Sequence, residues 1–73
     1  MKVIQVSTTN PRFTKYNTVR GNLSENESQY KFYPDNPERI NSGYTTSRVQ
    51  KAGIVEDQFV LTTLNSVYTY EIM

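Results

Sequence analysis

Cationic and aromatic side chains alternate in one stretch near the start of the sequence. Arg12-Phe13-Thr14-Lys15-Tyr16 is followed by Arg20. Phosphates attract Lys and Arg, and unstacked bases stack on aromatic rings, so this mixture is typical of proteins that bind single-stranded nucleic acid. A net charge of +1 falls short of the charge such binders usually carry. The alternative interpretation is that Phe13 or Tyr16 belongs to the core while the cations face solvent.

A second grouping of the same residue types surrounds a proline-containing segment. Tyr33 and Tyr44 flank residues 34–43, which also contain Arg39. Six Tyr in 73 residues exceed what a core of this size easily hides, so we expect some of these rings at a binding surface. The alternative is that the hydroxyls lie at the rim of the barrel with their rings inside. Either a host protein or a small anionic ligand fits that chemistry. The preferred contact residues are Arg12, Tyr16, Arg20, Arg39 and Arg48.

Catalysis has little support in the sequence. The chain contains no His and no Cys, which excludes an imidazole base, a thiolate nucleophile and an ordinary zinc site. Its acidic pairs, Glu25/Glu27 and Glu56/Asp57, match neither a catalytic carboxylate pair nor a calcium loop, and both fall in expected turns. Three Gly are too few for a glycine-rich phosphate loop. We therefore predict a protein that is not an enzyme, with no catalytic residue, no metal site and no cofactor.

The composition favours strands. Val, Ile and Thr are abundant while Ala and Leu are scarce, and β-branched side chains suit a pleated, half-buried surface. A chain of 73 residues forms one small β domain, residues 1–73, whose core offers little stability to spare. Because no disulfide supplements that core, self-association into a homo-oligomer is a reasonable expectation. The sequence contains no apolar run long enough to span a membrane or to form a signal peptide, which predicts a cytoplasmic protein.

Proline, glycine and turn residues divide the chain into short predicted strands. Strands are expected over 2–8 and 13–20, then a loop and a strand within 23–33, and finally strands over 44–54, 59–64 and 67–72. Ser24-Glu25-Asn26-Glu27 also fits a helix capping box, so a short helix within 23–33 stays open. Asn36 and Pro37 predict one helical turn near 36–41. The sum is an all-β chain of about six short strands, folded as a small partly open barrel or a strongly bent antiparallel sheet.

The last two predicted strands form a hairpin. With Asn65-Ser66 as a two-residue loop, the pairs run from Leu64 opposite Val67 to Phe59 opposite Ile72. The expected core face then contains Phe59, Leu61, Thr63, Tyr68, Tyr70 and Ile72. The preceding turn has either two residues, Glu56-Asp57, or three, and Gly53 suits a bulge in the strand before it.

The C-terminal part also carries a resemblance. The segments Thr46-Ser47-Arg48-Val49, Phe59-Val60-Leu61-Thr62-Thr63 and Asn65-Ser66-Val67-Tyr68-Thr69-Tyr70-Glu71 resemble the ending of small phage and mobile-element proteins, over residues 45–72. The resemblance implies an accessory protein in the host cytoplasm that binds a host protein or a small signalling nucleotide. The expected function is therefore a non-enzymatic binding protein, an inhibitor that occludes or sequesters a host component. The alternatives are a single-stranded nucleic-acid-binding small barrel and a structural virion component.

Overall fold

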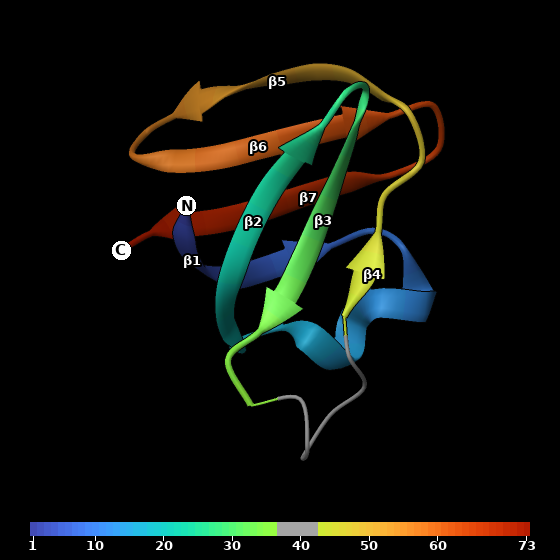
Figure 1. Ribbon diagram of the computed structural model, residues 1–73. Coiled ribbons are helices and arrows are strands. Elements are labelled where there is room, and N and C mark those ends of the chain that lie inside the picture. Colours follow the sequence, from blue (N-terminus) through green and yellow to red (C-terminus); the bar gives the residue numbers. More distant parts are fainter. Residues whose placement is uncertain (37–42) are drawn as a thin grey trace.

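The computed structural model describes residues 1–36 and 43–73. These residues form one antiparallel sheet in the order β4-β3-β2-β1-β7-β6-β5 and one short 3-10 helix, η1 (Figure 1). The two edge strands, β4 and β5, do not pair with each other, so the predicted all-β, bent and open sheet is confirmed. The elements are β1 (Lys2–Thr8), η1 (Pro11–Tyr16), β2 (Arg20–Asn26), β3 (Gln29–Pro34), β4 (Tyr44–Thr45), β5 (Val49–Val55), β6 (Gln58–Thr63) and β7 (Val67–Ile72).

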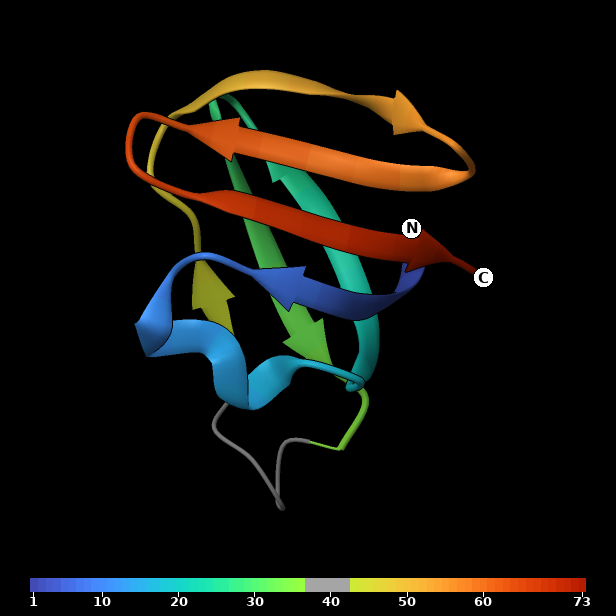
Figure 2. The same cartoon turned by 180° about the vertical axis from the view of Figure 1, so that it is seen from behind.

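The sheet folds over on itself. The β2–β3 hairpin lies across β1, β7 and β6 when the molecule is seen from either side (Figures 1 and 2). The rings of Phe32 and Tyr70 lie 6.1 Å apart across this interior, and those of Tyr30 and Phe59 lie 5.8 Å apart. The segment between β4 and β5 is tied to the hairpin, because the Thr46 N–H donates to the Tyr30 carbonyl at 2.8 Å. The start of β5 is tied to it as well, because the Val49 N–H donates to the Ser28 carbonyl at 2.6 Å. The fold is therefore a strongly curved sheet with one open side, between the hairpin and β5.

The core occupies the concave face. The buried apolar residues are Val3, Tyr16, Leu23, Phe32, Tyr44, Phe59, Leu61, Tyr68 and Tyr70. The core face predicted for the last hairpin is confirmed except at Ile72, which is 42% exposed. The predicted pairing is wrong by two residues, because Thr62 opposes Val67. The turn lies at Leu64-Asn65, because the Thr63 N–H donates to the Ser66 carbonyl at 2.8 Å and the Thr63 hydroxyl accepts from the Ser66 N–H at 3.1 Å. A shift of two preserves the side-chain alternation, which is why the predicted face survives.

The strand predicted over 13–20 is wrong. Residues Pro11–Tyr16 form η1, and β2 begins at Arg20. The Asn10 side-chain oxygen accepts from the Arg12 N–H at 3.0 Å, and Pro11 occupies the first helical position. Asn-Pro thus starts a helical turn here. The turn predicted near 36–41 on the same grounds lies outside the described residues, apart from Asn36.

The remaining segments differ in detail from the prediction. The strand expected within 23–33 is confirmed as β3, but the loop before it is the strand β2 and the helix alternative is wrong. The single strand expected over 44–54 is interrupted because Thr46 is buried and its hydroxyl accepts from the Tyr30 N–H at 3.0 Å. The two-residue Glu56-Asp57 turn is confirmed, with positive φ at both positions. The bulge in β5 lies at Gln50 instead of Gly53.

Candidate functional site

The residues predicted as contacts do not converge. Arg12 lies in the first turn of η1, with its guanidinium 5.6 Å from the Phe13 ring centroid. Arg20 begins β2, and Arg48 precedes β5 at the opposite end of the β2–β3 hairpin (Figure 1). Arg39 lies outside the described residues. Tyr16 is 1% exposed, so its ring packs in the core and offers a partner no surface.

The expectation of surface tyrosines holds at Tyr33, whereas four other tyrosines are buried in the core. Tyr16, Tyr44, Tyr68 and Tyr70 are all buried, whereas Tyr33 is 47% exposed. The core accommodates four tyrosines because the rings stack on one another and the hydroxyls find polar partners. Tyr44, for example, has ring centroids of Phe13 and Tyr68 at 4.3 Å and 5.7 Å. The number of tyrosines is evident in the sequence, but the polar group that lets their rings pack inside is not.

That polar group is Gln5, a fully buried residue of β1. Its side-chain oxygen accepts from the Tyr44 hydroxyl, which also lies 2.6 Å from the Tyr70 hydroxyl. Its side-chain nitrogen donates to the Phe13 carbonyl at 3.0 Å and to the Asn17 side chain at 2.9 Å. Burial raises the pKa of both Tyr44 and Tyr70 far above the ordinary value. Both hydroxyls stay neutral near pH 7, and the cluster is part of the packed core.

Replacing Gln5 with leucine is expected to lower the free energy of unfolding by about 3 kcal/mol. Leucine has similar size but leaves the Phe13 carbonyl and the Tyr44 hydroxyl without their Gln5 partners in the core. Urea denaturation followed by circular dichroism measures the change. Ser7→Leu, on an exposed position of the same strand, is the matched control and is expected to change stability by less than about 0.5 kcal/mol. Equal effects at the two positions would contradict a stabilising role for the Gln5 cluster.

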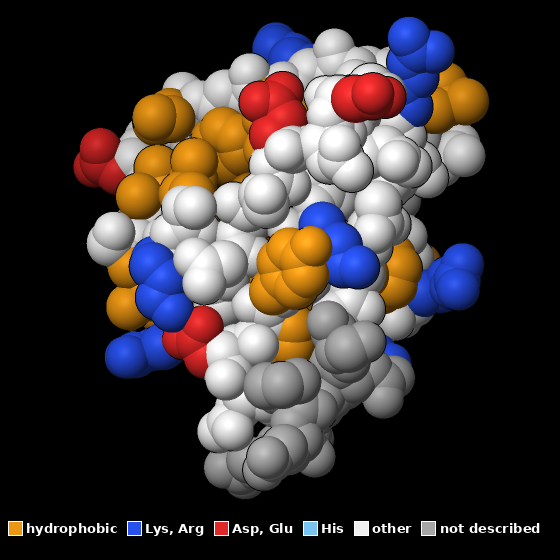
Figure 3. All heavy atoms as spheres, in the orientation of Figure 1, with side chains coloured by type: hydrophobic (Ala, Val, Ile, Leu, Met, Phe, Trp, Pro, Cys, Tyr) orange, Lys and Arg blue, Asp and Glu red, His pale blue; other side chains and the backbone are white. Residues whose placement is uncertain are grey.

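An apolar strip, which we define as Ala52, Ile54, Phe59 and Ile72, extends from the core to the open side of the sheet. Ala52 lies opposite the buried Leu61, and Ile54 lies opposite Phe59, so both strand residues share the concave face. Nevertheless, Ile54 is 67% exposed while Phe59 is 8% exposed. Apolar side chains gather over the ends of β5 and β6 in the space-filling view (Figure 3). The strip is thus core-like in position but uncovered at its outer end.

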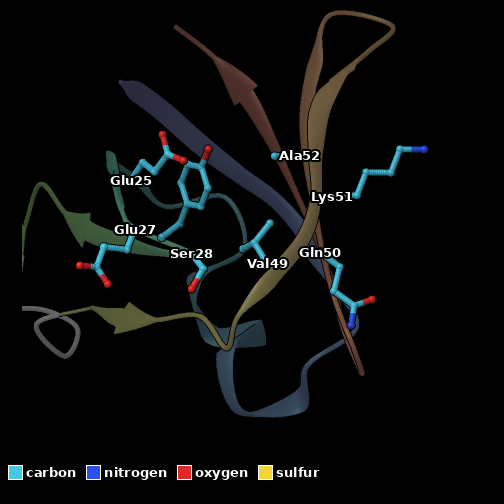
Figure 4. A pocket seen from close by; sticks show the side chains of 8 residues that line it. Glu25, Glu27, Ser28, Val49, Gln50, Lys51 and Ala52 are labelled. Carbon is cyan, nitrogen blue, oxygen red and sulfur yellow. The ribbon is translucent and has the colours of Figure 1, made fainter.

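A hollow of about 200 Å³ adjoins the strip, between the β2–β3 turn and β5. On the β5 side, Ala52 and Lys51 line the hollow, and the Lys51 side chain extends away from Glu25 and Glu27 (Figure 4). Glu25, Glu27 and Tyr30 line the hairpin side. Partial burial and then the negative charge of Glu25 raise the pKa of Tyr30.

Carboxylates lie at both ends of the exposed half of β5, which comprises residues 52–55. Glu25 and Glu27 line the hollow beside Ala52, and Glu56 and Asp57 form the turn after Val55. Within residues 1–36 and 43–73 the only ion pair joins Lys2 to Asp35 at 2.7 Å, so none of these four carboxylates is in an ion pair. No group of His, Cys, Asp or Glu in the same residues could hold a metal ion. These carboxylates therefore act as a negative rim around an apolar surface.

The outer side of β5 is bonded to the hairpin at Val49, whose N–H donates to Ser28, and among the described residues it is unpaired from Ala52 onward. β5 pairs with β6 alone, and Val55 and Gln58 flank the two-residue turn, which makes them a hydrogen-bonded pair. Alternation then directs the N–H and C=O groups of Ala52 and Ile54 away from β6. Edge strands with such groups are natural sites for adding another strand. No part of this site was predicted. The sequence does show an apolar pair, Ile54-Val55, before an acidic turn, but not that this strand is an edge.

Comparisons with protein families, with curated proteins and with solved structures found no match. No helix in the described parts of this chain is long and apolar enough to cross a membrane.

Proposed function

We propose that this protein is a non-enzymatic binding protein that holds a protein partner at the apolar strip and the free edge of β5. The observation that carries the proposal is the 67% exposure of Ile54 on a sheet face whose neighbouring residues, Phe59 and Leu61, are buried. Leaving a large apolar side chain in water at such a place is costly unless a partner covers it. Exposed apolar side chains beside buried aromatic residues often contribute a large share of the binding free energy of an interface.

The chemistry of the surface supports binding over catalysis. The buried hydroxyls of Tyr44 and Tyr70 are neutral and satisfied by Gln5 and by each other, so neither is available to a substrate. The separation of Arg12, Arg20 and Arg48 favours a protein partner over a small anion, because an anion site needs several cations at one point. The C-terminal resemblance to small phage and mobile-element proteins supports an accessory role in which the chain occludes a host protein.

Affinity capture from an extract of the source or host cells tests the proposal. The wild-type chain is expected to recover one stoichiometric partner, and Ile54→Lys is expected to lose it. Burying that new charge against Phe59 should weaken the complex by about 30-fold or more. Since Ile54 is already exposed, the substitution should leave the fold intact, which circular dichroism checks.

A double variant, Arg20→Ala/Arg48→Ala, serves as the second arm. It is expected to keep the partner, because both arginines lie away from the apolar strip. Loss of the partner in the double variant but not in Ile54→Lys would move the site to the arginines. Recovery of no stoichiometric partner by the wild-type chain would contradict the proposed function. Salt-dependent binding of a labelled single-stranded oligonucleotide, unaffected by Ile54→Lys, would favour the nucleic-acid alternative instead.

A further inference from the structure

The free edge of β5 specifies the shape of what binds there. Ala52 and Ile54 direct a row of donors and acceptors away from β6, and their side chains stay exposed. A row of this kind is satisfied by an extended chain, which adds to the sheet as one more strand. A helix or a compact loop would leave those backbone groups unpaired under its surface. The edge therefore favours an extended segment.

The apolar strip specifies the alternate side chains of that segment. A strand added beside β5 places every second side chain on the concave face, next to Ala52 and Ile54. Ile54 is 67% exposed there, and Phe59 lies behind it. Apolar residues at these alternate positions bury the strip, so the segment should alternate between apolar and polar residues over its length.

The carboxylates near β5 indicate the charge of the segment that binds there. Glu25 and Glu27 lie at one end of the exposed half of β5, and Glu56 and Asp57 at the other, with none of them in an ion pair among the described residues. The cations nearest in sequence to this half are Arg48 and Lys51, and the Lys51 side chain, although it lines the hollow, extends away from Glu25 and Glu27 (Figure 4). The two ends of this part of β5 thus carry carboxylates, and a segment carrying Lys or Arg at its ends complements them.

A second copy of this chain fits the same edge less well. Antiparallel pairing of two β5 strands would bring the acidic Glu56-Asp57 turn of one copy towards the end of β5 where Glu25 and Glu27 line the hollow of the other. Like charges brought together across an interface are unfavourable. The charge distribution therefore selects a basic partner over self-pairing.

We infer that the partner recognised at this surface presents an extended, basic segment of alternating apolar and Lys or Arg residues, which adds to the sheet along β5 with its apolar side chains over Ile54 and its cations near Glu25, Glu27, Glu56 and Asp57. The inference rests on the proposed function and assigns the chemical class of the partner to the same site.

Selection from a random peptide library tests this assignment directly. Peptides of about eight residues, long enough to run along an edge strand, are panned against the immobilised full-length chain at low salt. Selected sequences are expected to be enriched in Lys or Arg alternating with Val, Ile or Leu. A synthetic consensus peptide is then compared with the same peptide in which Glu replaces every Lys and Arg. The acidic form is expected to bind at least about 30-fold more weakly, and raising the salt concentration should weaken the basic form.

Matched variants locate the contact. Glu25→Gln/Glu27→Gln is expected to weaken binding of the consensus peptide by about tenfold. Glu71→Gln is the control, because Glu71 is an exposed carboxylate that opposes Ile4 and Gln58 on the other face of the sheet, and it should leave binding unchanged. Amide chemical shifts of Ala52 and Ile54 are expected to move most on titration with the peptide.

Three results would overturn the assignment. These are selected peptides without a cationic preference, equal effects of the Glu71 and Glu25/Glu27 variants, and a concentration-dependent dimer in sedimentation that Ile54→Lys abolishes. The last result would show that a second copy of this chain pairs with the edge of β5. Suppose that one of these results is found, while the wild-type chain captures a cellular partner that Ile54→Lys does not. The inference of an extended basic segment is then refuted, and the proposed binding function is retained. If the wild-type chain captures no partner either, the proposed function fails with it.

Discussion

Replacing Gly21 with alanine is expected to lower the free energy of unfolding by about 3 kcal/mol, which is a large part of the stability of so short a chain. Gly21 is buried in β2, between Val3 of β1 and Pro34 of β3. A Cβ atom there would meet the Tyr33 carbonyl oxygen and would lie 2.8 Å from the Phe32 ring. Phe32 is fully buried, so its ring has no free space into which to move. The strands would have to separate where the sheet bends.

Gly53 provides a control of the same chemistry in the same sheet. A Cβ atom at this position meets nothing within 4 Å, and the residue lies in β5. Gly53→Ala is therefore expected to be neutral or to stabilise the fold by about 0.5 kcal/mol, because alanine loses less conformational freedom on folding. Urea denaturation followed by circular dichroism measures both variants. A Gly21→Ala protein as stable as the wild type would show that the β2–β3 hairpin yields easily at this point, contrary to the packing described above.

Alternation in the sequence was sufficient to predict much of the sheet. Side chains in the last hairpin stay on the same face when the pairing of its two strands shifts by an even number of residues. The burial of Phe59, Leu61, Tyr68 and Tyr70 was therefore predicted correctly despite an error of two residues in the pairing. At Glu56-Asp57 the turn residues allowed a two-residue or a three-residue turn, and the structure has the two-residue form. These features depend on neighbours in the sequence, and a single chain contains that information.

Residues 13–20 were predicted wrongly and the candidate site was missed because both depend on contacts between residues far apart in the sequence. The 13–20 stretch follows Asn10-Pro11, and the helical form of its first residues is stabilised by a hydrogen bond from Gln5 to the Phe13 carbonyl. Nothing local marks Gln5 as a buried residue. The candidate site was not predicted for a similar reason. The exposure of Ile54 depends on β5 being an edge strand, and the order of all the strands decides which strand is an edge. The arginines that looked notable in the sequence are dispersed by the same topology.

Above pH 10 the protein is expected to lose stability steeply. Burial raises the pKa of Tyr44 and Tyr70 above the ordinary value of 10.0. In the unfolded chain both hydroxyls ionise near that ordinary value, whereas the folded state keeps them protonated. Stability is therefore complete below pH 10 and falls as the pH rises, by about 1.4 kcal/mol per pH unit for each hydroxyl. Near pH 12 the combined loss of about 5 kcal/mol is comparable with the whole stability expected for a chain of this length.

Two tyrosine variants separate this linkage from the general effect of alkaline charge. Tyr70→Phe removes one of the two buried hydroxyls while Gln5 still accepts from Tyr44, so the slope of stability against pH should fall to about half. Tyr33→Phe removes an exposed hydroxyl and should leave the slope unchanged. Urea denaturation at a series of pH values gives the slope, and tyrosinate absorbance reports when the hydroxyls ionise. Absorbance that reaches its full amplitude while circular dichroism stays native would mean that the Gln5 cluster tolerates charge, because water then reaches Tyr44 and Tyr70 without unfolding.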